Sequence, residues 1–140
     1  MKGKPVKDSE VIVTYIVQPP DINSVGTIFG GRVMEWMDLA AAACATRYAR
    51  RVCVTASMDA LHFISPIHLG EIVMLKAQVN YTHRTSLEVG VRVEAENPLS
   101  GEQRHAVSAY LTLVALGDDG RPTPVPPSGH GSSPGSLRNG

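Results

Sequence analysis

Two consecutive glycines, Gly30 and Gly31, lie directly before the stretch of the sequence that most favours a helix. Glycine lets the backbone adopt positive φ or come close to a ligand. The first turn of a helix presents unpaired N–H groups with a partial positive charge. Together these features suit an anion, or the oxyanion that forms when a carbonyl group is attacked. The same glycines could serve only to turn the chain into the helix, so this interpretation needs a second residue.

Asp38 is the second residue whose position suggests chemistry. It lies seven residues beyond Gly31, and about 700° of helical rotation returns it to nearly the same face as the helix start. Its neighbours include Met37, Leu39 and a run of alanines. A carboxylate in largely apolar surroundings is costly unless it is paired or takes part in a reaction. A position on the outer, solvent-facing side of the helix is the alternative interpretation of Asp38.

The other residue types that often carry chemistry show no comparable pattern. The five histidines lack the H-x-H and H-E-x-x-H spacings of metal sites, and there is no G-x-S-x-G motif of a Ser-His-Asp hydrolase. The two cysteines, Cys44 and Cys53, are too few for a zinc site of their own or for a disulfide scaffold. We therefore expect reduced thiols, with Cys44 packed in the helix, and no metal site.

The elements that must position these residues can be predicted from hydrophobic patterning. Residues 32–50 contain no Gly or Pro and predict one long helix of roughly 27 Å. Apolar and polar residues alternate from Leu87 to Glu96 with period two, which is typical of a strand with one buried face. The predicted strands cover residues 11–17, 52–63, 72–81, 87–96 and 104–116.

One helix cannot cover the crossovers that five parallel strands would require, so the sheet must be mostly antiparallel. The predicted fold class is therefore α+β, with one long central helix wrapped by a curved antiparallel sheet of about five strands. Small side chains at residues 40–43 and 45 would let the helix lie close to the sheet. The open edges of such a sheet favour pairing between subunits, so we expect at least a dimer.

Composition and charge set the expected limits of the domain and of its partners. We expect an N-terminal arm over residues 1–7, one domain over 8–118, and a Pro-, Gly- and Ser-rich tail over 119–140 that is disordered from about residue 126. The 13 Lys and Arg balance the 13 Asp and Glu, so charge gives no reason to expect a nucleic acid or an anionic membrane as partner. The longest apolar stretch is far shorter than the roughly 20 residues of a membrane span. Because no apolar signal segment stands at the N-terminus, we expect a cytoplasmic protein.

The pattern Asn23-x-x-Gly26-x-x-x-Gly30-Gly31, followed by Asp38, resembles the signature of the hotdog-fold acyl-CoA thioesterases, in particular the short bacterial acyl-CoA hydrolases of the YciA type. Two downstream stretches are similar to that family as well: Phe63-x-x-Pro66-x-x-x-Gly70-Glu71 and Thr82-His-Arg84-Thr85-Ser86. The resemblance spans roughly residues 8–117 and implies a hotdog fold, in which the curved sheet surrounds the helix.

The resemblance implies hydrolysis of an acyl-CoA to a free carboxylic acid and CoA, in an active site shared across a dimer interface. Asp38 would be either the general base that activates water or the nucleophile that forms an anhydride. Asn23, from the other subunit, would hold the water or the thioester by hydrogen bonds. The backbone N–H of Gly31, together with that of Gly30, would stabilise the oxyanion.

The CoA portion of the substrate is expected at Arg84, Thr85 and Ser86, because a guanidinium group, two hydroxyls and backbone N–H groups suit phosphate. An ordinary polar turn is the alternative interpretation of these residues. CoA would be part of the substrate, so no further cofactor is implied. The expected partners are the acyl-CoA and other copies of the chain, as a homodimer that assembles to a tetramer or hexamer.

Two other functions fit parts of the same pattern. A hotdog dehydratase would need a catalytic histidine near the helix start, and the sequence has none beside the glycines. A non-catalytic acyl-CoA-binding protein, regulatory or structural, could keep the glycines and Arg84 but would have no use for Asp38.

Overall fold

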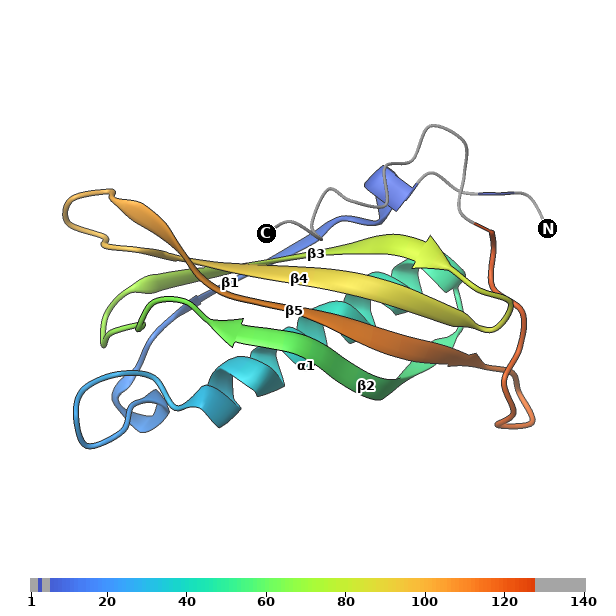
Figure 1. Cartoon of the computed structure of the whole chain (residues 1–140), viewed down its shortest axis with the longest axis horizontal. Coiled ribbons are helices and arrows are strands. Elements are labelled where there is room, and N and C mark those ends of the chain that lie inside the picture. Colours follow the sequence, from blue (N-terminus) through green and yellow to red (C-terminus); the bar gives the residue numbers. More distant parts are fainter. Residues whose placement is uncertain (1–2, 4–5, 128–140) are drawn as a thin grey trace.

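The computed structural model describes residue 3 and residues 6–127. Within these residues one long helix, α1 (Gly30–Ala49), lies along one face of a five-stranded sheet (Figure 1). The sheet has the order β1-β3-β4-β5-β2, and every pair of neighbouring strands is antiparallel. The strands are β1 (Val11–Ile16), β2 (Val52–Phe63), β3 (Ile72–Thr82), β4 (Ser86–Glu96) and β5 (Gln103–Leu116). This architecture confirms the predicted α+β class.

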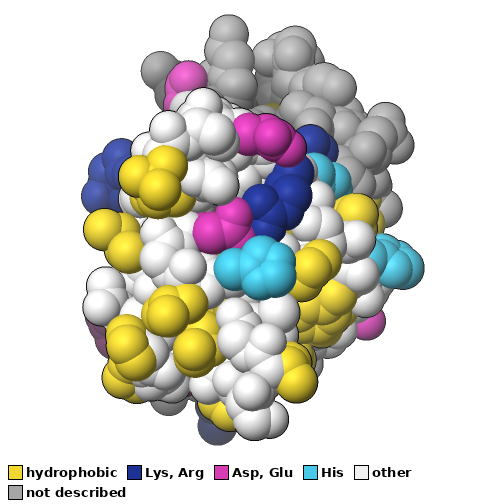
Figure 2. All heavy atoms as spheres, turned by 90° about the vertical axis from the view of Figure 1, so that its left-hand side faces the viewer, with side chains coloured by type: hydrophobic (Ala, Val, Ile, Leu, Met, Phe, Trp, Pro, Cys, Tyr) yellow, Lys and Arg dark blue, Asp and Glu magenta, His cyan; other side chains and the backbone are white. Residues whose placement is uncertain are grey.

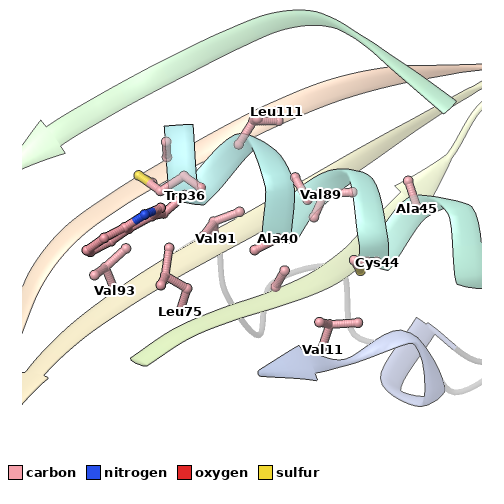
Figure 3. Packing of buried hydrophobic residues seen from close by; sticks show 14 of the residues in the cluster. Val11, Trp36, Ala40, Cys44, Ala45, Leu75, Val89, Val91, Val93 and Leu111 are labelled. Atoms are coloured by element: carbon pink, nitrogen blue, oxygen red, sulfur yellow. The ribbon is translucent and has the colours of Figure 1, made fainter. Parts of the chain in front are cut away.

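Alternation along the strands builds the core between the sheet and α1 (Figure 3). The inward positions of β4 are at most 1% exposed: Leu87, Val89, Val91, Val93 and Ala95. The buried face of α1 consists largely of small residues, which lets the helix lie close to the sheet: Ala40, Ala41, Cys44, Ala45 and Ala49. At the other half of α1, the ring of Trp36 stacks on that of Tyr15 from β1, with 4.3 Å between the ring centroids. Each large apolar side chain buried here contributes about 1.5–3 kcal/mol to stability.

β2 is an edge strand, because β5 is its only partner among the described strands. Register shifts follow Thr55 and Asp59, and Ala60 has a left-handed backbone with φ of 51°. Val52 and Val54 on this strand are exposed. A free edge with apolar side chains favours pairing with another chain.

The helix begins two residues earlier than predicted, at Gly30 instead of Arg32. Phe29 has the extended backbone of an N-cap, and both glycines belong to the first helical turn. The connection between β1 and α1 is therefore shorter than the predicted helix start implies, and it contains a 3₁₀ helix, η2 (Pro19–Asp21).

The packed part of the chain reaches beyond residues 8–118 at both ends. A 3₁₀ helix, η1 (Val6–Ser9), places Val6 in the core with no exposed surface. Val125 is also buried, and its N–H donates to the carbonyl of Arg84 at 3.0 Å. The disorder expected from about residue 126 concerns mainly residues 128–140, which lie outside the described residues, as do residues 1, 2, 4 and 5 of the expected arm.

No helix in the described part of the chain is both long enough and apolar enough to cross a membrane.

Candidate active site

The first turn of α1 presents free backbone donors. The N-cap residue Phe29 supplies no capping side chain, and within residues 6–127 no acceptor pairs with the N–H groups of Gly30 and Gly31. The chain leading to this turn is fixed, because Phe29 N–H donates to the carbonyl of Asp21 at 2.9 Å and Arg32 Nε pairs with Asp21 Oδ1 at 3.1 Å. The turn is thus a rigid site for a negatively charged oxygen.

The two glycines have different steric environments. A Cβ atom added at Gly30 would lie 3.3 Å from Cζ of Phe63, so the glycine lets that ring pack closely against the helix start. A Cβ atom added at Gly31 would meet nothing within 4 Å, and the backbone there is helical. Packing therefore explains Gly30, whereas the surface at Gly31 is open to a ligand.

Asp38 lies two turns further along α1, at about 10.5 Å along the axis from Gly31. Its carboxylate Oδ1 accepts a hydrogen bond from Oγ1 of Thr55 in β2, at 2.5 Å. Asp38 is half-buried and Thr55 is exposed, so the surroundings of the carboxylate are less apolar than the sequence suggests. The hydroxyl of Thr55 fixes one carboxylate oxygen at the junction of α1 and β2.

Thr55 escaped the sequence analysis. A β-branched threonine is an ordinary residue in a strand, and the sequence contains nothing that would mark this one as a partner of Asp38. Only the pairing of β2 with β5 and the packing of α1 on the sheet bring the two side chains together.

Asn23 organises the loop before the helix. Its Oδ1 accepts hydrogen bonds from the N–H groups of Val25 and Thr27, at 3.0 and 3.2 Å, and its Nδ2 donates to Oγ1 of Thr27 at 2.9 Å. The turn includes Gly26 with φ of 87°. Among the described residues, no hydrogen bond joins Asn23 to Asp38, so hydrogen bonding within one chain does not link these two predicted residues.

The third predicted group, Arg84, Thr85 and Ser86, lies at the corner between β3 and β4. Figure 1 shows this corner at the opposite end of the molecule from the start of α1. The carbonyl of Thr85 accepts from the N–H of Ala115 at 3.0 Å, whereas the exposed guanidinium of Arg84 has no ion pair within residues 6–127. The corner is accessible to a phosphate but distant from Gly31 in the same chain.

The cysteines take no part in this site. Both are free and buried, and burial raises the pKa of the Cys44 thiol to about 11. A thiol with such a pKa stays protonated near neutral pH and is a poor nucleophile. In the described residues no group of three His, Cys, Asp or Glu side chains is placed to hold a metal ion.

Residues 25–102, more than half of the chain, match the Thioesterase superfamily. The chain belongs to the thioesterase superfamily. This member is 42% identical over 120 residues to an uncharacterized acyl-CoA thioester hydrolase, YkhA, of Bacillus subtilis, covering 86% of this chain and 70% of the relative. It is 36% identical over 118 residues to protein VdlD of Helicobacter pylori, covering 84% of this chain and 67% of the relative.

Solved structures of thioesterases show the same hotdog architecture. An apo-hexameric acyl-CoA thioesterase superposes with a TM-score of 0.89 at 42% identity, covering 92% of this chain and 83% of the other. An acyl-CoA hydrolase from Staphylococcus aureus, in complex with butyryl coenzyme A, coenzyme A and coenzyme A disulfide, superposes with a TM-score of 0.86 at 36% identity, covering 90% and 77%. Other structures of that S. aureus hydrolase carry alanine in place of an aspartate, an asparagine or a threonine.

Proposed function

We propose that this thioesterase hydrolyses acyl-CoA thioesters to a free carboxylic acid and CoA. The observation that carries the proposal is the pairing of unoccupied N–H groups at Gly30 and Gly31 with a carboxylate, Asp38, held by Thr55 two turns along the same helix. The acyl-CoA hydrolases among the relatives support this choice of substrate.

Asp38 supplies the attack on the thioester carbonyl. Thr55 donates to Oδ1, which leaves Oδ2 to accept a proton from water or to attack the carbonyl carbon itself. The asparagine, aspartate and threonine replaced in the S. aureus structures stand 15 and 17 residues apart in that chain, and Asn23, Asp38 and Thr55 have the same spacing here. This match supports a shared role for the three residues.

The N–H groups of Gly30 and Gly31 stabilise the negative charge that develops on the thioester oxygen. The partial positive charge of the helix start adds to the two hydrogen bonds. A thiolate leaves readily, so the site needs no strong general acid beside the leaving sulfur.

A second copy of the chain completes the site. Asn23 contacts its own loop and not Asp38 in one chain, so we assign the asparagine beside each Asp38 to the partner. Pairing of β2 edges about a two-fold axis would turn the partner end for end, which would bring its Arg84, Thr85 and Ser86 corner toward the glycine end of the first copy. The hexameric relatives support assembly of such dimers into a tetramer or hexamer.

The alternative functions are less consistent with the site. A non-catalytic acyl-CoA-binding protein would not need the hydrogen bond between Thr55 and Asp38. A dehydratase would need a histidine at the helix start. His68 comes near it through a backbone bridge with Thr27, which the sequence did not reveal, but its side chain is exposed.

A cytoplasmic location and independence from metals and cofactors stay predictions, although one rat relative is named a cytosolic hydrolase.

Replacing Asp38 tests the proposal. Asp38→Asn keeps the size of the side chain but removes its basicity, so we expect kcat/KM for acyl-CoA substrates to fall by about 10²–10⁴-fold. A thiol reagent measures the released CoA, and thermal unfolding checks that the fold is intact. Glu35→Gln, an acid-to-amide change at an exposed position of the same helix, serves as control and should keep its activity. Unchanged turnover in Asp38→Asn would contradict the mechanism, and binding of acyl-CoA without release of CoA by the wild type would favour the non-catalytic function.

A further inference from the structure

A hollow of about 340 Å³ lies beside the first turn of α1. This volume is in the range of small-molecule sites. It is lined by Thr27, Ile28, Gly30, Phe63, Ile64, Ser65, Pro66, Ile67 and Val107. Gly30 belongs both to the lining of the hollow and to the proposed oxyanion site. A thioester carbonyl held at the helix start would therefore place either its acyl chain or its CoA arm in or next to this hollow.

The lining is chemically suited to a hydrocarbon. Of its side chains only Thr27 and Ser65 are polar, and each already accepts a hydrogen bond, from Asn23 Nδ2 and from Arg104 Nε. No charged side chain lines the hollow. The pantetheine arm of CoA carries amide groups that would lose hydrogen bonds to water here, whereas an acyl chain would lose none.

We infer that this hollow binds the acyl group of the substrate and that Phe63 sets the length of chain it accepts. The inference rests on the proposed thioesterase function and adds the location and the limit of the acyl site. Figure 2 shows the end of the molecule that lies on the left in Figure 1, where hydrophobic side chains gather on the lower part of the face.

The wall opposite the helix is held firmly enough to discriminate by size. The N–H groups of Ile64 and Ser65 both donate to the carbonyl of Ala106 in β5, and Ile28 N–H donates to the carbonyl of Ile67 at 2.8 Å. Arg104, also in β5, donates to Ser65 Oγ and to the carbonyl of Pro66. A wall fixed at several points keeps its shape when a longer chain enters.

Phe63 is the part of the lining that substitution can change without disturbing the core. It is the last residue of β2 and is 52% exposed, yet its ring lies against Gly30. The ring therefore lines the hollow next to the helix start and is itself partly open to solvent. Removing it would lengthen the space available to an acyl chain.

The test measures kcat/KM for a series of saturated acyl-CoAs from two to sixteen carbons. Each methylene that enters the hollow should raise kcat/KM by about fourfold until the hollow is full. In Phe63→Ala the optimum should move to longer chains, and the ratio of long-chain to short-chain kcat/KM should rise by at least about tenfold. In Val107→Ile, which adds a methylene at the buried end of the lining, the optimum should move to shorter chains.

Leu99→Ala is the matched control, since Leu99 is 96% exposed, lies in the turn between β4 and β5, and is not among the residues that line the hollow. An optimum that stays in place in both Phe63→Ala and Val107→Ile, while turnover persists, would overturn the acyl-site assignment and leave the thioesterase function standing. The affinity of Asp38→Asn for the same acyl-CoAs separates the two proposals further. If the wild type hydrolyses none of them, chain-length-dependent binding that changes when Phe63→Ala is added would keep the acyl site and refute the hydrolase. Binding that is independent of chain length would refute the acyl site.

Discussion

At the scale of single residues, Gly31 is a glycine at a helical position where alanine would make the fold more stable. Glycine is about 1 kcal/mol less favourable than alanine within a helix, and no neighbouring atom would meet a Cβ there. At Gly30 the absence of a side chain helps packing, since an added Cβ would lie 3.3 Å from the ring of Phe63. A glycine that the fold does not require is typical of a position that a ligand must approach closely.

We expect Gly31→Ala to separate stability from activity. The free energy of unfolding should rise by up to about 1 kcal/mol, whereas kcat/KM should fall by about 10- to 100-fold, because the new methyl group displaces the thioester from the N–H donors. Chemical denaturation and CoA release measure the two effects. Gly30→Ala is the comparison and should gain less stability than Gly31→Ala, because the Phe63 ring, 3.3 Å from the new Cβ, has to shift to accommodate it. A fully active Gly31→Ala protein would show that substrate does not approach this amide.

At the scale of elements, patterns within one segment were predictable and contacts between segments were not. The alternation from Leu87 to Glu96 gave β4 nearly to the residue, because burial of one face imposes that period directly. The start of α1 was missed, since glycine is disfavoured in helices and only the extended backbone of Phe29 reveals the cap. The pairs Thr55–Asp38 and Arg104–Glu71 were missed for another reason: the two residues of each pair are 17 and 33 positions apart along the chain.

The connection between β2 and β3 is fixed by one such long-range pair. Glu71 accepts two hydrogen bonds of 2.7 Å from Arg104, and its Oε1 also accepts from the N–H of His68. Hydrogen bonds from Arg104 are the main reason that the pKa of Glu71 is lowered. A carboxyl group whose pKa is lower in the folded chain stabilises the fold above its unfolded-state pKa, and this contribution is lost as pH falls through the folded-state value.

Glu71→Gln should therefore destabilise the protein in a pH-dependent manner. At pH 7 we expect the free energy of unfolding to fall by about 1–3 kcal/mol, because the half-buried Arg104 loses a charged partner. The difference from wild type should begin to shrink as pH falls below the ordinary pKa of a glutamate, and it should disappear as pH passes through the lowered pKa of Glu71 in the folded protein. Urea unfolding at a series of pH values measures it, with the exposed Glu102→Gln as control. A difference that is constant between pH 7 and pH 3 would show that Glu71 does not act through its charge.

At the scale of the whole molecule, one chain contains every predicted residue, but no hydrogen bond in the described part of the chain joins Asn23 to Asp38. Asp38 is held by Thr55 near the free edge of the sheet, while Asn23 is held by Thr27 in the loop before α1. A symmetric dimer has two equivalent sites, and each would combine Asp38 of one copy with Asn23 of the other. Shared sites of this kind predict a result in mixed dimers that sites built from a single chain would not give.

Mixing two inactive variants should restore activity. Asp38→Asn and Asn23→Ala should each have little turnover alone. In a mixed dimer with shared sites, one site carries both defects and the other carries none, because its Asp38 and its Asn23 come from different copies. Half of the sites in the mixed dimers should therefore be intact, so activity per site should reach about half that of the wild type. Co-expression with two affinity tags and measurement of CoA release from the doubly purified protein tests this. If both residues of a site came from one chain, every site in the mixture would keep one defect and activity would stay at the level of the separate variants.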